Sequence, residues 1–154
     1  MFRYHTLRRE QRLAQSPEEV FDFFGDAGNL EAITPPSLSF RIVTPRPIEM
    51  GTGTLIEYRL RMRGLPLMWL TRIEEWIPAR RFVDNQLSGP YALWHHTHEF
   101  EPTGDGGTLM RDTVRYALPF WPLSEVAHAV FVRKELAAIF DYRHAEVARR
   151  FAPG

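Results

Sequence analysis

Histidine and aspartate residues recur at alternate positions in residues 82–116. His96 and His98 stand two apart in one run, with Asp84 in the preceding run and Asp112 in the following one. Alternate side chains of a β-strand point to the same face, so we expect both imidazoles on one face with the carboxylates on neighbouring strands. A carboxylate beside an imidazole raises the imidazole pKa and fixes its tautomer. His96 or His98 with Asp84 or Asp112 is therefore the candidate general acid/base pair.

Aromatic side chains share these faces with the polar ones. The alternating residues of the three runs are Phe82, Asp84 and Gln86; Trp94, His96, His98 and Phe100; and Thr108, Met110, Asp112, Val114 and Tyr116. A face that holds Trp, Phe and Tyr is expected to be buried, and an unpaired buried polar group costs several kcal/mol. The polar groups therefore pair with one another or line a cavity, and we predict a cavity. The alternative is a polar network that only fixes the strand register.

The turns between these runs predict how the strands are paired. If residues 103–107 set their hairpin so that opposed residue numbers sum to about 208–210, Asp112 lies opposite His96 or His98. Across the turn that follows residue 87, Asp84 is expected near His96.

Two histidines and two carboxylates are suitable ligands for zinc or iron. Their spacing matches no known metal signature, so we expect neither a metal nor another cofactor. The chain has no cysteine, which excludes disulfides and thiolate catalysis and fits a cytoplasmic location. It also lacks a phosphate loop, a dinucleotide glycine pattern and a nucleophile elbow.

The composition predicts one folded domain, residues 1–154. Lys plus Arg and Asp plus Glu both number 19, so no general basic field favours nucleic acid as a partner. No apolar run approaches the ~20 residues that span a bilayer, which argues against integral membrane association.

The pattern along the chain is typical of an α+β fold. Residues 4–14 alternate like a half-exposed strand, and Ser16 caps a short helix whose capping box is closed by Glu19. A second short helix is expected to end at Pro35. Strands are then expected at 38–44, 54–63, 66–77, 80–87 and in the two runs that end at 100 and 116.

A long helix is predicted over about 122–151, with one apolar stripe that includes Leu136 and Phe140. Arg143 lies within that stripe. Because arginine is rarely buried without a partner, we expect it to pair with Asp84 or Asp112, with contact to a ligand carboxylate as the alternative. A curled antiparallel sheet covered by one amphipathic helix leaves space between the layers, where small-molecule pockets form.

The chain resembles the START/polyketide-cyclase superfamily, also called SRPBCC, and within it the bacterial branch labelled cell-division-inhibitor-like or coenzyme-Q-binding-like. The residues that carry the resemblance are Ser16-Pro17-Glu18-Glu19-Val20-Phe21, Asn29-Leu30, Pro66, Trp69, Phe82-Val83-Asp84-Asn85-Gln86, Gly89-Pro90-Tyr91, Trp94-His95-His96-Thr97-His98-Glu99-Phe100, Gly107-Thr108, Asp112-Thr113-Val114-Arg115-Tyr116 and Phe140-Asp141-Tyr142-Arg143. The resemblance implies a helix-grip fold, in which about seven strongly curved antiparallel strands wrap a long C-terminal helix around an apolar cavity. It does not imply one chemistry, because such folds host many functions.

The leading functional hypothesis is a binding protein for an apolar or aromatic small molecule, such as a polyketide-like, isoprenoid, quinone or acyl lipid compound. The residues expected to contact it are Tyr58, Met62, Trp69, Phe82, Asp84, Gln86, Trp94, His96, His98, Met110, Asp112, Tyr116, Leu136, Phe140 and Arg143. One alternative is a cyclase, dehydratase or hydrolase that uses the His–Asp pair. Another is an interaction or homodimerisation module, supported by Phe120, Trp121 and Phe131 if they are exposed.

Overall fold

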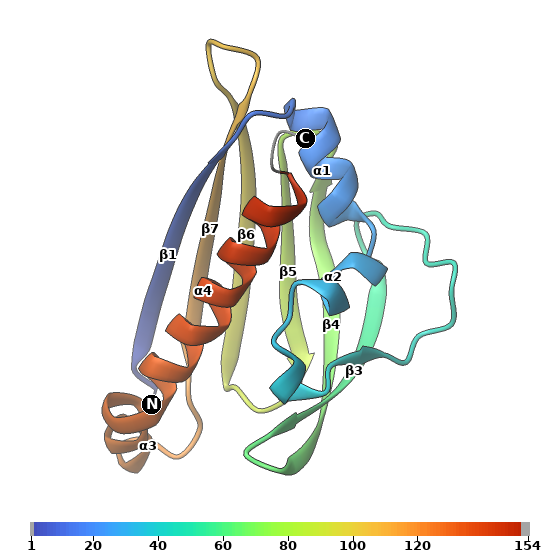
Figure 1. Ribbon diagram of the computed structural model, residues 1–154. Coiled ribbons are helices and arrows are strands. Elements are labelled where there is room, and N and C mark those ends of the chain that lie inside the picture. The colour runs from blue at the N-terminus through green and yellow to red at the C-terminus, as the bar shows by residue number, and fades with distance from the viewer. Residues whose placement is uncertain (1, 152–154) are drawn as a thin grey trace.

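A seven-stranded antiparallel sheet makes up most of the chain in the computed structural model, which describes residues 2–151 (Figure 1). Met1 and residues 152–154 of the expected domain lie outside the described residues. The strands are β1 (Tyr4–Leu13), β2 (Arg41–Ile42), β3 (Leu55–Met62), β4 (Leu65–Ile77), β5 (Arg81–Ser88), β6 (Leu93–Pro102) and β7 (Thr108–Ala117). Their order across the sheet is β1-β7-β6-β5-β4-β3-β2, so the connection from β1 to β2 crosses from one edge to the other and the later connections join neighbours.

The sheet curves around the C-terminal helix, as the helix-grip prediction requires. Figure 1 shows α4 (Arg133–Arg150) running diagonally across the face of the sheet, with α1 (Pro17–Gly25) and α2 (Gly28–Ala32) completing the cover beside it. On α4 the buried residues recur at spacings of three and four, which is the apolar stripe of a helix that packs on one side: they are Leu136, Phe140, Arg143 and Val147. The expected fold class is confirmed.

Local sequence signals explain how α1 begins. The Ser16 side chain accepts a hydrogen bond from the backbone N–H of Glu19, at 3.3 Å, and Pro17 occupies the first turn. This satisfies one of the amide donors that a helix N-terminus leaves without a partner. The cap directs the chain from β1 into the helix that closes one end of the fold.

The expected long C-terminal helix is continuous but not uniform. It comprises α3 (Leu123–Ala127), a π-helical segment η2 (His128–Val132) and α4. Such π-helical turns insert an extra residue into the helical ladder. The apolar periodicity of the sequence did not reveal this segment.

The expected strand at residues 38–44 is wrong for most of its length. A 3₁₀ turn, η1 (Pro36–Leu38), occupies its start, and only the two residues of β2 pair with β3. Ser39 has a left-handed backbone, with φ 47°, and this turns the chain away from an extended course. Prolines at 45 and 47 then prevent regular pairing beyond β2.

The predicted register of the central strands is confirmed. In the β6–β7 pair the opposed residue numbers sum to 210, which places His98 directly opposite Asp112. In the β5–β6 pair Asp84 lies opposite His96. Burial alternates along β6, and its buried positions are Trp94, His96, His98 and Phe100. The polar residues of the segment therefore point into the fold with its aromatics.

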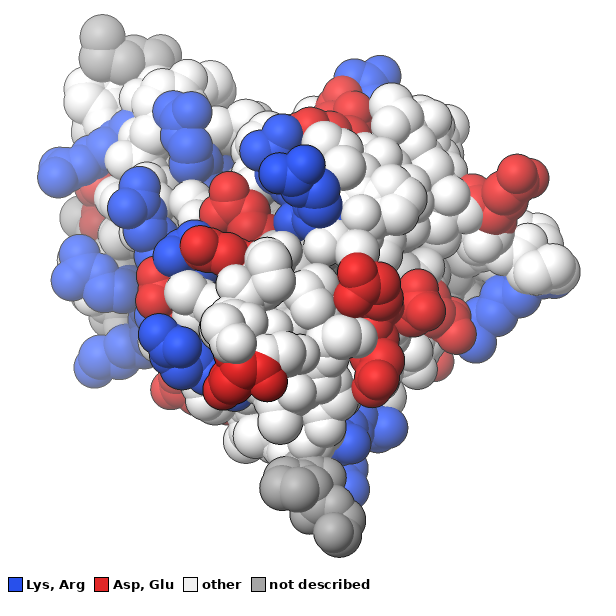
Figure 2. Space-filling view, turned by 90° about the horizontal axis from the view of Figure 1, so that it is seen from above, with Lys and Arg blue, Asp and Glu red and all other residues white. Residues whose placement is uncertain are grey.

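Two further properties of the described residues bear on partners. No helix among residues 2–151 has the length and apolar character needed to cross a lipid bilayer. Figure 2 shows basic and acidic side chains together on the face seen from above, with uncharged surface between them.

Candidate ligand cavity and polar cluster

A cavity of about 170 Å³ lies between the sheet and the helices that cover it. Its floor is formed by the inward residues of β3 to β6, and its roof by α4 together with the α1–α2 segment. Most of the wall is apolar and aromatic, whereas the charged and imidazole groups gather on β5, β6 and α4. The cavity expected from the sequence is therefore present in the fold.

Most residues predicted to contact a ligand line this cavity. They are Tyr58, Met62, Trp69, Phe82, Asp84, Trp94, His96, His98, Leu136, Phe140 and Arg143. These residues come from five separate elements, and the curvature of the sheet brings them together.

Four residues of the predicted set lie outside the lining. The Gln86 amide donates to the carbonyl of Tyr91 and accepts from its amide, so this side chain holds the β5–β6 turn. Met110 packs in the apolar core beneath α1. The hydroxyl of Tyr116 is hydrogen-bonded to His128, at 2.7 Å. Asp112 lies behind the histidines and contacts them directly.

Part of the cavity wall was not predicted from the sequence. The omitted residues include Phe24, Ala27, Leu30 and Ile33 from the two short helices, and Ile56, Leu60, Thr71 and Ile73 from the sheet. Ile56 and Leu60 share a face of β3 with Tyr58 and Met62, so strand periodicity alone would have identified them. The helical residues carried only a helix-packing signal.

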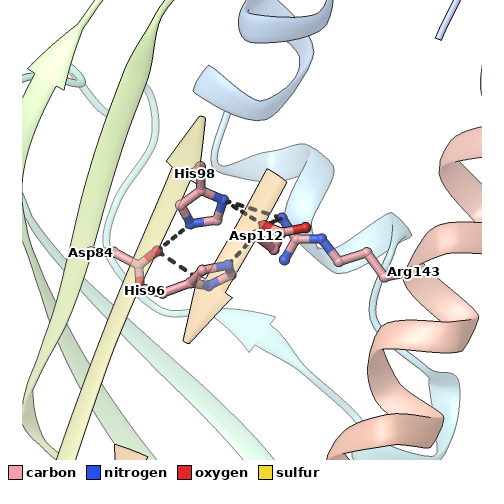
Figure 3. Close-up of polar contacts among 5 residues, drawn as sticks. All are labelled: Asp84, His96, His98, Asp112 and Arg143. Carbon is pink, nitrogen blue, oxygen red and sulfur yellow. Dashed lines mark hydrogen bonds and ion pairs between the residues drawn. The ribbon is translucent and has the colours of Figure 1, made fainter. Parts of the chain in front are cut away.

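A polar cluster lies on the wall formed by β5, β6 and β7 (Figure 3). His98 Nε2 lies 2.6 Å from Asp84 Oδ2, and His96 Nε2 lies 2.8 Å from Asp112 Oδ1. The register places His96 opposite Asp84 and His98 opposite Asp112. The shortest contacts therefore run diagonally between neighbouring strands. Two longer contacts complete the cluster, His98 Nδ1 to Asp112 at 3.3 Å and His96 Nδ1 to Asp84 at 3.7 Å.

Arg143 joins the cluster from α4. Figure 3 shows its side chain reaching the Asp112 side of the histidines, whereas Asp84 lies on the other side. Arg143 Nη2 is 3.6 Å from Asp112 Oδ1 and 3.4 Å from His98 Nδ1. The predicted pairing of this arginine with an aspartate is present, and it ties the helix to the sheet.

Burial and charge act in opposite directions on the two histidines. Burial and the neighbouring His98 lower the pKa of His96 to about 4, despite the nearby carboxylates. Burial also acts to lower the pKa of His98, but its hydrogen bonds to Asp112 and Asp84 outweigh burial and raise it. Of the two imidazoles, His98 therefore holds a second proton more readily than His96.

The carboxylates remain ionised in this environment. Burial acts to raise the pKa of Asp84, but His96, His98 and Arg143 together lower it. Burial opposes ionisation of Asp112 as well, yet Arg143 and the two histidines hold its pKa well below the usual range. The charge of Arg143, together with a proton on His98, would balance the two carboxylates. This charge balance offsets the large penalty for burying ions.

The cavity also contains phenol groups that can donate hydrogen bonds. Burial, assisted by the charge of Asp84, raises the pKa of Tyr58. Burial also raises the pKa of Tyr91, with Glu135 contributing. Both phenols therefore keep their protons. The wall offers neutral donors and ionised groups within one largely apolar space.

Two groups in the described part of the chain have the donor types of a metal site. Asp84, His96 and His98 each offer a ligand atom, and these atoms lie within 4.8 Å of one another. A second group, formed by His5, Glu125 and His128 where β1 meets the C-terminal helix, satisfies the same distance. This second group was not predicted from the sequence, because its members are far apart in the chain.

The segment that precedes α4 exposes apolar side chains, as the interaction hypothesis requires. Phe120 is 81% exposed and Leu123 78% exposed, and the neighbouring exposed residues are Trp121, Val126, Val130 and Phe131. No partner chain is part of the structure, so homodimerisation stays a prediction.

Similar folds occur in proteins of several kinds. Protein TTHA0849 from Thermus thermophilus aligns with a TM-score of 0.75 at 21% identity, covering 96% of this chain and 97% of the other. The Zhui aromatase/cyclase from Streptomyces sp. R1128 aligns with a TM-score of 0.68 at 17% identity, covering 99% of both chains. A norcoclaurine synthase mutant from Thalictrum flavum, in complex with a transition-state analogue, gives a TM-score of 0.68 at 14% identity, covering 97% and 98%. At these identities the likeness shows the fold alone.

Sequence comparison supplies the family. No functionally curated protein matches the chain. The family model described as polyketide cyclase / dehydrase and lipid transport matches residues 13–139, which include the whole cavity-bearing sheet from β2 to β7 and the start of α4. The chain therefore belongs to the polyketide cyclase / dehydrase and lipid transport family.

Proposed function

We propose that this protein binds one apolar or aromatic small molecule, bearing at least one oxygen function, in the cavity between the sheet and α4. The observation that carries the proposal is the division of the cavity wall into a broad apolar part and one polar cluster. Such a division suits a ligand with a carbon skeleton at one end and an oxygen at the other. The family and the fold of an aromatase/cyclase support the same class of ligand.

The apolar part of the cavity is suited to a ring system. Trp69, Tyr91 and Trp94 pack together, with the Trp69 and Trp94 ring centroids 5.1 Å apart in an edge-to-face arrangement. Aromatic edges and faces of this kind pack well against further rings. Met50 and Met62 also line the space, and methionine adapts its shape to an irregular ligand.

The cavity volume bears on the size of the ligand. An apolar cavity of about 150 Å³ is large enough for benzene, so the space of about 170 Å³ accepts a single ring without rearrangement. Pockets for larger ligands occupy roughly 300–1,000 Å³. A polycyclic or long-chain ligand therefore requires the methionines or the α1–α2 segment to move.

The polar cluster would bind the oxygen of the ligand. Asp84 and the two histidines line the cavity, as does Arg143, whereas Asp112 does not. A ligand carbonyl, phenol or enol oxygen at this wall would meet both charged donors and a carboxylate acceptor. The cluster thereby fixes the orientation of the ligand within an otherwise apolar space.

A binding assay with a cavity-filling variant tests the proposal. Ile139 is a half-buried cavity residue on α4, and Ile139→Trp places an indole in the space. We expect the affinity for a single-ring phenol, used as the probe, to fall at least about tenfold, equivalent to about 1.4 kcal/mol. Val132→Trp is the matched control. Val132 is also half-buried and belongs to the same continuous helix, in η2, but it lies outside the cavity lining. Equal affinities for both variants and the wild type would place the probe elsewhere.

An enzymatic role is the second candidate, favoured by the contact between imidazole and carboxylate at the cavity wall. His96→Gln would then leave ligand affinity intact and remove turnover of a polyketide-like substrate. Turnover that persists in both His96→Gln and His98→Gln would exclude these residues as the acid/base pair.

A further inference from the structure

We infer that Asp84, His96 and His98 form a site for one divalent transition-metal ion at the cavity wall, with Asp112 as the residue that orients both histidines. This inference goes beyond the binding of an apolar molecule and does not depend on it. Two imidazoles and one carboxylate are a donor set that suits Zn²⁺ or Fe²⁺.

The two histidines present one nitrogen to each side of the cluster. On one side, His98 Nε2 and His96 Nδ1 both face the same atom, Asp84 Oδ2, at 2.6 and 3.7 Å. On the other side, His96 Nε2 and His98 Nδ1 both face Asp112 Oδ1, at 2.8 and 3.3 Å. Metal-binding histidines usually donate their second N–H to a carboxylate, which fixes the tautomer. Asp112 is placed to do this for both rings.

The contacts of His96 leave one nitrogen without a proton. At 2.8 Å from Asp112, His96 Nε2 must carry the hydrogen that it donates. In the tautomer that this contact fixes, the lone pair is on Nδ1, and Nδ1 lies 3.7 Å from Asp84 Oδ2, beyond hydrogen-bond distance. Two acceptors that face each other without a proton between them repel. A cation placed between them would remove this repulsion.

The distances fit a bound ion with a small adjustment. Ligands about 2.1 Å from a tetrahedral ion are about 3.4 Å from one another. The separations of 2.6 and 3.7 Å between Asp84 and the two nitrogens lie on either side of this value. The ligand atoms of all three residues are within 4.8 Å of one another. A shift of the Asp84 side chain toward His96 would bring both of its separations close to this value.

The Asp84 side of the histidines is the side open to a metal. Asp84 lines the cavity and its side chain is 18% exposed, whereas Asp112 is 7% exposed and outside the lining. Arg143 already occupies the Asp112 side, 3.6 Å from the carboxylate. An ion bound at Asp84 would therefore have its remaining coordination positions directed into the cavity.

Charge balance predicts what completes the coordination. The ion would take the place of a proton between His98 and Asp84. The two positive charges of the ion and the one of Arg143 would then exceed the charges of the two carboxylates by one. An anionic oxygen, from water-derived hydroxide or from a ligand in the cavity, balances that charge. We therefore expect the site to prefer metal ions that accept an oxygen ligand in addition to the three side chains.

The second histidine group is less suited and serves as a control. His128 Nε2 is already engaged by the Tyr116 hydroxyl at 2.7 Å. Glu125 is shared by His5 at 3.2 Å and by Arg3 at 3.6 Å.

Titration of chelator-treated, tag-free protein with Co²⁺ and Zn²⁺ tests the site, using Co²⁺ visible absorption and calorimetry. The wild type is expected to bind one equivalent. His98→Gln and Asp84→Asn are expected to lose the Co²⁺ spectrum, and Asp112→Asn to weaken affinity about 10- to 100-fold. The matched controls are His95→Gln, on the opposite face of β6, and His5→Gln. Both are expected to bind as the wild type does.

Two results would overturn the inference. One is the absence of stoichiometric Co²⁺ binding by the folded wild-type protein, which would leave the cluster as a network held by protons. The other is a Co²⁺ spectrum that survives in His98→Gln and Asp84→Asn, or disappears only in His5→Gln. Circular dichroism of each variant checks folding; if His98→Gln does not fold, the two aspartate variants decide the outcome.

Discussion

The imidazole rings of His96 and His98 stack with their centroids 3.6 Å apart and their planes at 28°. Two protonated imidazoles at this separation would repel strongly in a buried site. This contact adds to burial in lowering the pKa of His96, whereas the hydrogen bonds to Asp112 and Asp84 raise the pKa of His98. The stack thus disfavours a second imidazolium in the cluster.

Removing Arg143 is expected to destabilise the fold strongly. Arg143→Met keeps much of the apolar stem but leaves Asp112 in a buried site without the cation 3.6 Å away. Breaking a buried ion pair by removal of one partner costs about 3–5 kcal/mol. Arg149→Met is the control, since Arg149 pairs with Glu146 at the surface and such pairs contribute below about 1 kcal/mol. Urea unfolding measures both; similar losses would show that the buried network contributes little to stability.

Two serine substitutions are expected to have opposite effects. Ser16 caps α1 through its hydrogen bond to the Glu19 amide, so Ser16→Ala should cost about 1 kcal/mol of unfolding free energy. The hydroxyl of Ser124 is buried and has no hydrogen-bond partner among the described residues. Ser124→Ala removes an unsatisfied polar atom and should be neutral or stabilising. Thermal unfolding of the two variants compares them directly, and a larger loss for Ser124→Ala would contradict the assignment.

His128 is expected to make stability depend on pH. Burial, with the nearby His5, Arg133 and Arg3, lowers its pKa below the ordinary 6.5, although Glu125 acts in the other direction. Below about pH 6.5 the unfolded chain therefore takes up a proton on this residue that the folded chain does not. The free energy of unfolding should consequently fall as the pH falls through this window. No contribution from His128 is expected above it.

The comparison of variants isolates this effect from the His96–His98 cluster. Unfolding free energies measured at about pH 7.5 and about pH 5.5 should differ less in His128→Gln than in the wild type. His95→Gln, on the outer face of β6, is the control and should retain the wild-type difference. If His128→Gln retained that difference too, His128 would not be the source of the pH dependence.

The sequence predicted the strand pairing around the site because side-chain period and turn position constrain register strongly. A one-residue slip would have turned Trp94 and Phe100 to the solvent with the histidines. The same reasoning could not tell which carboxylate each imidazole contacts. That depends on side-chain rotamers, and the structure shows diagonal contacts instead of the directly opposed pairs.

The cavity roof was harder to predict than its floor. The wall contributed by Ala27, Leu30 and Ile33 depends on how the two short helices sit over the sheet, which no local pattern encodes. The expected strand at 38–44 failed for a related reason, since the left-handed Ser39 diverts the chain and serine carries no clear signal for that conformation. Tyr116 and Met110 share a strand face with Asp112, yet packing against the helices directs them away from the cavity.

A crystal structure of the protein soaked with a phenol would show where an aromatic ligand that carries one oxygen binds. We expect electron density inside the cavity, with the ring against Trp94 and Leu136 and the oxygen toward Asp84, His98 or Arg143. Density confined to the exposed apolar surface around Phe120 and Leu123, with the cavity unchanged, would contradict it.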